Sequence, residues 1–295
     1  MKIKRAMVIV ALGLFGLFGA TAWAATPAER AASKECVQCH DQDDLPAWQR
    51  SPHAQAQDPR TPACVSCHGP SEQHVHGKPQ GKPDRMFTKG SPTPIAERNA
   101  ACLNCHQKDA KRAMWGGSQH ESADLACTTC HRIHTNNDRV TARATQADVC
   151  FTCHKEQRTQ FMRPSHHPVP EGKMTCTDCH NPHGSTGPKL VKRDSTNDTC
   201  YTCHAEKRGP FVFSHEPVTE DCANCHNPHG TTVASMLKVR PPMLCQQCHT
   251  PHVAGGIGAV GGQPGVFGPA APGQLAPAIT NVTNGKNVVN IWQGR

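Results

Sequence analysis

The chain repeats one pattern almost letter for letter, as CTDCHNPHG at residues 176–184 and as CANCHNPHG at residues 222–230. In both copies two cysteines separated by two residues precede a histidine, and a second histidine follows three positions later. All 18 cysteines of the 295-residue chain fall into such C-x-x-C-H motifs, so the motif occurs nine times. One repeated chemical unit therefore decides how the chain is built.

The C-x-x-C-H spacing is the attachment signature of c-type haem. Two thiols at this separation can form thioethers with both vinyl groups of one porphyrin, and the next imidazole can then bind the iron. Zinc ribbons and disulfides also use C-x-x-C pairs, but neither needs a histidine directly after every pair. The predicted attachment residues are Cys36, Cys39, Cys64, Cys67, Cys102, Cys105, Cys127, Cys130, Cys150, Cys153, Cys176, Cys179, Cys200, Cys203, Cys222, Cys225, Cys245 and Cys248. The predicted motif ligands are His40, His68, His106, His131, His154, His180, His204, His226 and His249.

Eleven further histidines lie outside the motifs, and nine of them follow two patterns, which predicts nine covalently attached haem c groups with low-spin bis-His iron. One set follows a serine between two motifs, namely His53, His120, His166 and His215. The other set follows a motif, namely His74, His134, His183, His229 and His252. A histidine three residues after a motif histidine lies on the same face of a helix, so it is expected to serve a neighbouring haem rather than its own.

Two choices within these sets stay open. His76 is an almost equal alternative to His74. His167 can replace His166, although matching the segment 165–169 to the segment 214–218 favours His166.

The composition predicts a fold whose core is made of haem. Apolar residues make up 36% of the chain, only 13 residues are aromatic, and 25 Pro and 24 Gly interrupt the backbone. Such a chain has too little apolar surface to offset the entropy of ordering its backbone. We expect a multihaem cytochrome c fold, with short α-helices and irregular coil wrapped around a haem stack and little or no β-sheet.

The chain is predicted to have three parts. Residues 1–24 read as a secretory signal peptide, with a basic start, an apolar stretch and an Ala-Trp-Ala cleavage pattern. Residues 25–252 form a nonahaem region built of dihaem repeats, at about 36–101, 102–149, 150–199 and 200–244, with an incomplete fifth repeat from 245. Residues 253–295 form an extended segment rich in Gly and Pro.

The charge of the chain gives no support for a nucleic-acid partner. The formal net charge of +8 includes three basic residues of the predicted signal peptide, and no basic run interleaved with aromatic residues follows. The signal peptide predicts export of the mature protein to the periplasm. The charge pattern predicts that nucleic acid is not among its partners.

Closely packed haems of similar ligation predict electron transfer, at low potential because no Met ligand is indicated. A soluble periplasmic carrier or electron reservoir that supplies a terminal reductase is the alternative. A multihaem reductase is a weaker alternative, because catalysis at haem needs an open iron position. Each of the nine motifs has a candidate second histidine, so the chain is predicted not to be an enzyme and to have no catalytic residue.

The chain resembles the periplasmic decahaem cytochromes c of outer-membrane porin–cytochrome conduits, the Mtr, Mto and Pio types grouped with the DmsE family. The resemblance covers the mature chain and is carried by CVSCHGP at 64–70 with His74, by the two NPHG segments, by CQQCHTPH at 245–252 and by the Gly-rich stretch after it. It implies a wire between periplasm and cell exterior, held in an outer-membrane β-barrel porin, in extracellular oxidation or reduction of metal such as iron. Implied partners are periplasmic or inner-membrane redox cytochromes and an extracellular cytochrome or metal ions.

The chain departs from that family in having nine motifs in place of ten. In similar proteins a tenth motif follows a Gly-rich connection like the one here. The sequence is therefore expected to be either a truncated or interrupted form, or a nine-haem variant.

Overall fold

The computed structural model describes residues 25–42, 44–55 and 57–248. Among these residues the regular structure consists of short helices, and no helix is long and apolar enough to cross a membrane. The predicted signal peptide, the segment 253–295, His249 and His252 lie outside the described residues.

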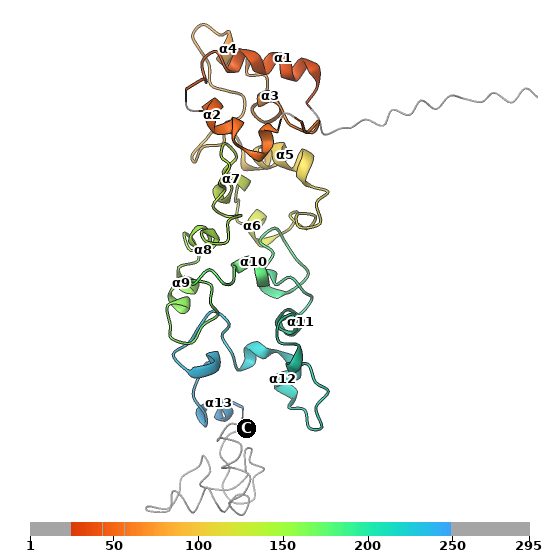
Figure 1. Ribbon diagram of the computed structural model, residues 1–295, viewed down its shortest axis with the longest axis vertical. Helices are drawn as coiled ribbons and strands as arrows, with labels where there is room; N and C mark the ends of the chain where they lie inside the picture. The colour runs from red at the N-terminus through yellow and green to blue at the C-terminus, as the bar shows by residue number, and fades with distance from the viewer. Residues whose placement is uncertain (1–24, 43, 56, 249–295) are drawn as a thin grey trace, which may run out of the picture. The chain divides into compact units, whose positions relative to one another are not determined.

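The helices follow one another along the chain with little other regular structure between them (Figure 1). The α-helices are α1 Pro27–Cys36, α2 Asp44–Gln49, α3 Cys64–His68, α4 Glu72–Val75, α5 Ile95–His106, α6 Gln119–Ser122, α7 Cys127–Cys130, α8 Gln146–Cys150, α9 Lys155–Phe161, α10 Cys176–Cys179, α11 Thr196–Tyr201, α12 Glu216–Glu220 and α13 Met243–Gln246. The 3₁₀ turns are η1 Pro52–Ala54, η2 Pro188–Leu190, η3 Ala205–Lys207, η4 Cys222–Asn224 and η5 Ala234–Met236.

Each of the eight motifs that lie wholly within the described residues includes a helical turn, and the third forms the end of the longer helix α5. The N–H of the motif histidine donates to the carbonyl of the first motif cysteine, for example from His131 to Cys127 and from His154 to Cys150, both at 3.0 Å. This bond closes a turn in which both thiols and the imidazole come from five consecutive residues. The local fold thus brings together the three groups that a c-type haem requires.

The apolar core of the described residues is small. It centres on Phe151, Phe161 and Val169, with Met174 among the partly buried residues packed against them. Isolated bridges are the only strand-like pairing in the described part of the chain, for example between His180 and Val191. The predicted fold class is confirmed, because the described residues form short helices and coil without a sheet. The side chains alone do not fill an interior.

The chain divides into two compact units, one of residues up to 105 together with 133–136, the other of residues 106–132 and from 137 onward. In the first unit α1 packs against α3, and its start is fixed by a capping box in which Thr26 and Glu29 bond each other's backbone N–H. The predicted repeat boundaries are finer than this division and stay a prediction.

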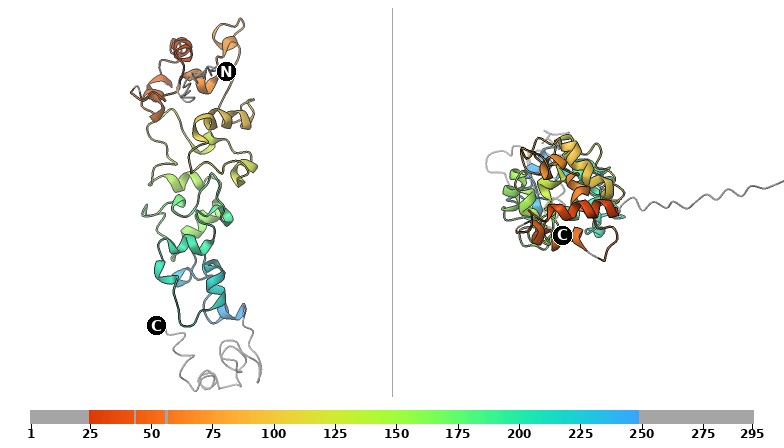
Figure 2. Two further views of the ribbon diagram at one scale, coloured as in Figure 1. Left: turned by 90° about the vertical axis from the view of Figure 1, so that its right-hand side faces the viewer. Right: turned by 90° about the horizontal axis from the view of Figure 1, so that it is seen from above.

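In the second unit the elements lie nearly in chain order along its length, from α7 and α8 to α12 and α13, in both side views (Figures 1 and 2). Successive motifs therefore follow one another in space as they do in the sequence. This order matters for the site, since haems attached to successive turns would be neighbours.

Candidate functional site

The predicted ligands meet in pairs, each made of one motif histidine and one histidine from outside the motifs. Within the part of the chain that the structure describes, six such pairs have ring centroids 6.0–6.2 Å apart. They are His40–His74 and His68–His134 in the first unit, and His131–His183, His154–His120, His180–His229 and His204–His167 in the second.

This separation fits one iron atom between two imidazoles. A metal–imidazole bond is about 2 Å long and the ring nitrogen lies about 1.1 Å from the ring centre, so two axial ligands place their centroids about 6.2 Å apart. Two unligated rings in contact prefer offset or edge-on packing at 4.5–7 Å and have no reason to repeat one value six times. The residues present therefore fit bis-His haem.

In five of the six pairs the two histidines come from different repeats, whereas His40 and His74 both lie in the first. His183 follows the sixth motif and faces His131 of the fourth, and His229 follows the eighth and faces His180 of the sixth. In the same way His134, after the fourth motif, faces the second. The geometry agrees with the expectation that these residues serve a neighbouring haem.

In most of these histidines a hydrogen-bond acceptor faces Nδ1, the ring nitrogen that points away from the partner ring, and so fixes the orientation of the imidazole. Main-chain carbonyls accept at 2.7–3.2 Å in five cases, which are His68 to Arg85, His74 to Gly81, His120 to Pro182, His167 to Pro228 and His180 to Lys189. His229 Nδ1 faces Oε1 of Gln160 at 3.2 Å. An Nδ1–H that donates in this way sets the tautomer in which Nε2 is free to bind metal.

The two NPHG segments share one backbone frame. Asn181 N–H donates to the Leu190 carbonyl at 2.8 Å, and its side-chain oxygen accepts from His183 N–H at 3.3 Å. Lys189 and Leu190 adopt positive φ angles of 53° and 60°, which turns the Lys189 carbonyl toward His180. The segment 227–238 repeats each of these features, with Ser235 and Met236 at φ 58° and 54° and the Ser235 carbonyl 2.8 Å from Nδ1 of His226.

The glycine of each NPHG segment lies against the backbone of another part of the chain. A Cβ on Gly184 would come within 2.0 Å of the Met114 carbonyl oxygen, and one on Gly230 within 2.3 Å of the Gln160 carbonyl oxygen. Their φ angles are +115° and +139°, so any other residue would be strained as well. Glycine at this position therefore lets the histidine before it reach its partner ring.

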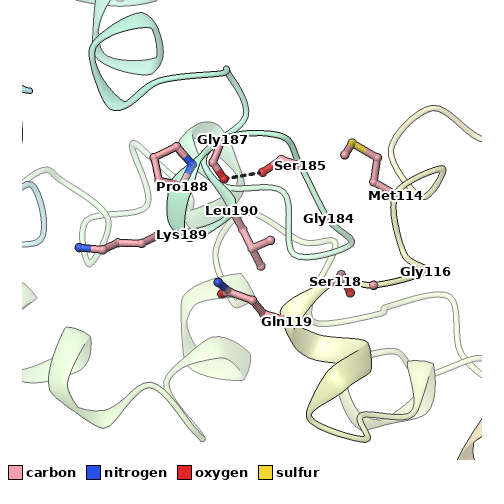
Figure 3. A pocket seen from close by; sticks show the side chains of 11 residues that line it. Met114, Gly116, Ser118, Gln119, Gly184, Ser185, Gly187, Pro188, Lys189 and Leu190 are labelled. Carbon is pink, nitrogen blue, oxygen red and sulfur yellow. Dashed lines mark hydrogen bonds between the residues drawn. The ribbon is translucent and has the colours of Figure 1, made fainter. Parts of the chain in front are cut away.

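A cavity of about 290 Å³ lies between two loops (Figure 3). One wall is the turn of residues 116–119 directly before His120, and the other is the loop of residues 184–190 directly after His183. Both walls thus belong to segments that adjoin predicted ligands in the sequence.

Burial keeps several of these imidazoles neutral. It is the main cause that lowers the pKa of His183 to about 4, with the charge of His131 adding to it. It likewise lowers the pKa of His229 to about 4, ahead of the charge of His180. A neutral imidazole is the form that binds metal, so the rings are ready for iron at neutral pH.

At one of the two open choices the structure places the alternative histidine, His167, opposite a motif histidine. The sequence match favours His166, but the ring that faces His204 is that of His167, at 6.2 Å between centroids. His166 instead lies 3.0 Å from Glu171 through Nε2 and is bonded to the Arg163 carbonyl through Nδ1. The physical reason is a repeated contact with the NPHG segments, because His120 and His167 both bond the carbonyl of the proline there.

One sequence signal points to His167, although His215 departs from it by lying directly after Ser214. His53, His120 and His167 each lie two positions after a serine, whereas His166 lies one position after it. The second open choice goes to His74, which faces His40. His76 lies 3.1 Å from Glu35 and 3.8 Å from Glu72, so both remaining histidines are beside carboxylates.

The other predicted ligands are placed by their local elements. His53 lies in η1 with its pKa lowered, chiefly by burial, and His106 ends α5. His215 precedes α12, and His226 follows η4. The histidines of the ninth motif lie outside the described residues.

Thiols of successive motifs lie close enough to affect one another. A hydrogen bond to Cys176, followed by burial, raises the pKa of Cys150. Burial raises the pKa of Cys130, and the neighbouring Cys153 adds to it. Further neighbours are Cys36 with Cys64, Cys67 with Cys105, Cys179 with Cys203, Cys200 with Cys222 and Cys225 with Cys245.

Comparison with known proteins agrees with this geometry. Residues 166–209 and 215–254 match a family model described as a doubled CXXCH motif, and residues 64–147 match one described as cytochrome c-type protein NrfB-like. The chain is 43% identical over 219 residues to the multiheme cytochrome MtrA of Shewanella baltica, strain OS185. The chain is therefore similar to multihaem c-type cytochromes, MtrA among them.

The chain is also similar to NrfB proteins, at 28% identity over 138 residues in Escherichia coli O6:H1 and 33% over 102 residues in Haemophilus influenzae. The alignments cover 44% and 32% of the chain, and 70% and 45% of those proteins. The MtrA alignment covers 72% of the chain and 65% of that relative, so the chain spans less than two thirds of its length. Covalently bound haem c follows from the motifs and the relatives together.

Proposed function

We propose that the chain carries nine haem c groups with bis-His iron and conducts electrons between them. The observation that carries this proposal is the repeated spacing of about 6 Å between a motif histidine and a second histidine. When bound, each haem supplies one reversible one-electron couple. The protein's part is to hold the imidazoles at fixed positions on both sides of each ring.

Two further observations support conduction along the chain. Thiols of successive motifs are neighbours in both units, so no long gap separates one attachment site from the next within a unit. At six of the nine proposed sites a second histidine faces the motif histidine, which would leave no coordination position for a substrate there. We therefore propose an electron-transfer protein rather than an enzyme.

The proposed place of this wire is between the periplasm and the cell exterior, within an outer-membrane β-barrel porin. Similarity to MtrA and the conduit resemblance support this place. Proposed redox partners are periplasmic or inner-membrane cytochromes on one side and an extracellular cytochrome or metal ions such as iron on the other.

The experiment begins with the intact mass of the exported protein, which should exceed that of the mature chain by nine haems. Ferric electron paramagnetic resonance should then show low-spin signals throughout. A different haem count, or a substantial high-spin signal, would contradict full bis-His ligation. Vesicles that enclose a reduced dye and carry the chain with its barrel should oxidise the dye when ferric citrate is added outside, and vesicles with the barrel alone should not.

A periplasmic carrier is the second candidate, and the NrfB similarity of residues 64–147 favours it. A carrier would be recovered in the periplasmic fraction without a barrel and would fail in the vesicle assay. Fractionation of a native host, with the barrel followed by mass spectrometry, separates the two candidates.

A further inference from the structure

The hydrogen-bond acceptor that faces Nδ1 of His131 differs from the acceptor at the matched motif histidines His180 and His226. Its Nδ1 lies 2.7 Å from Oδ2 of Asp138, whereas His180 and His226 face main-chain carbonyls at 3.0 and 2.8 Å. The other oxygen of Asp138 accepts the N–H of Arg132 at 3.1 Å. Both oxygens of this carboxylate are therefore engaged in a fixed geometry.

The pair is partly withdrawn from water, with 18% of the Asp138 side chain and 29% of the His131 side chain exposed. A carboxylate that accepts from the outer nitrogen of a metal-bound imidazole makes that ligand a stronger donor. Stronger donation and nearby negative charge favour the oxidised iron over the reduced iron. A neutral carbonyl has a much smaller effect of the same sign.

We propose that Asp138 is a positioning residue that lowers the reduction potential of the haem bound by His131 below that of the two matched sites, those of His180 and His226. This inference rests on the proposed ligation of His131 and His183. It assigns a specific role to a residue that is neither a thioether cysteine nor an iron ligand.

The surrounding charges do not cancel this carboxylate by direct pairing. Arg139, next to Asp138 in the chain, pairs with Asp148 at 3.3 Å. Arg112, whose charge acts on the opposite ligand His183, pairs with Asp109 at 2.9 Å.

A second carboxylate near a motif histidine makes a weaker contact. Glu206 lies 3.8 Å from Nδ1 of His204, beyond hydrogen-bond reach, and both side chains are more than half exposed. The His131 site is therefore the better place to look for a carboxylate effect on potential.

The test is spectroelectrochemical titration of the holoprotein with Asp138→Asn. The amide keeps the size of the side chain and an oxygen that can accept, but removes the negative charge. We expect about one ninth of the haem absorbance change to move to higher potential. Asp138→Glu should leave this component close to its wild-type position, because a carboxylate is restored.

Asp148→Asn is the matched control, since it removes an exposed carboxylate ten residues away that contacts Arg139 instead of a histidine. The inference is overturned if Asp138→Asn and Asp148→Asn change the titration equally while all haems stay low-spin. A substantial high-spin signal in the wild-type protein would instead count against the proposed ligation. Failure of the inference about Asp138 and failure of the proposed ligation are therefore distinguishable.

A measurement on the wild-type protein tests the inference even if the variants do not fold. Near-infrared magnetic circular dichroism reports the donor strength of axial imidazoles in ferric haem. About one ninth of the bis-imidazole band should be displaced from the rest, and the displaced part should rejoin the main band in Asp138→Asn. A single undivided band in wild type would overturn the inference.

Discussion

The segments 176–192 and 222–238 hold their motif histidines in the same way, and the segment 127–138 does so differently. In the first two, two consecutive residues with positive φ turn a carbonyl toward the imidazole of His180 or His226. In the third, the carboxylate of Asp138 takes the place of that carbonyl. Asp138 follows its motif histidine by seven positions, whereas the residues that supply the carbonyls follow theirs by nine. The ring pair across the proposed iron keeps the same spacing, at 6.0 Å for His131 and 6.1 Å for His180.

The comparison separates what ligation needs from what the local frame adds. Both frames deliver a fixed Nδ1–H donor, which is the requirement for an Nε2 ligand. They differ in charge, and a charge difference changes the energy of oxidised iron without changing the coordination. Repeats of this chain can therefore share one architecture and still differ in potential.

The largest effect is expected from removing a ligand in either frame. His183→Ala and His229→Ala should each convert one low-spin haem to high-spin, because the ligand opposite His131 or His180 is lost. Electron paramagnetic resonance of the ferric protein measures this. Equal conversion would show that the frame does not alter the need for the ligand, and no conversion in either variant would contradict the pairing.

His167→Ala and His166→Ala test the pairing that the sequence missed. His167→Ala should produce one high-spin haem, because its ring faces His204. His166→Ala should keep all haems low-spin and lose only its contact with Glu171. The reverse result would restore the assignment that the sequence match favours.

Gly184→Ala tests how tightly the NPHG frame is packed. We expect a loss of about 2–4 kcal/mol in the free energy of unfolding, from the positive φ and from the clash with the Met114 carbonyl. Gly117→Ala is the control, since its φ is +81° but nothing lies within 4 Å of the added Cβ. It should cost about 1 kcal/mol, and equal thermal shifts in the two variants would contradict the close approach.

A smaller effect is expected from Asn181→Ala. The Asn181 side chain donates to the carbonyls of Lys111 and Gly184 and accepts from His183 N–H. Losing these partly exposed bonds should cost about 1–2 kcal/mol by denaturant unfolding, with every haem still low-spin. A new high-spin signal would instead mean that Asn181 is needed to keep His183 in place.

The sequence was sufficient for the features that rest on short-range spacing. The positions of the motifs and the small size of the apolar core in the described residues follow from the C-x-x-C-H repeat and the composition, and the fold class is confirmed. The choice of His167 over His166 depends on a contact with Pro228, 61 residues away, and matching of local letters does not encode that distance. Asp138 lies only seven residues after His131, and its proposed role depends on the fold of the loop that returns its carboxylate to that imidazole.

Ligand exchange between repeats constrains how such a chain can change length. If the pairs are iron-bound, an internal deletion leaves unmatched imidazoles on both sides of the cut, unless it removes one whole period of two motifs. His229 occupies the same frame as His183 and His167 the same contact as His120, so after such an excision each remaining histidine meets an equivalent substitute. The architecture therefore admits insertions and deletions in steps of two motifs, and so of two haems.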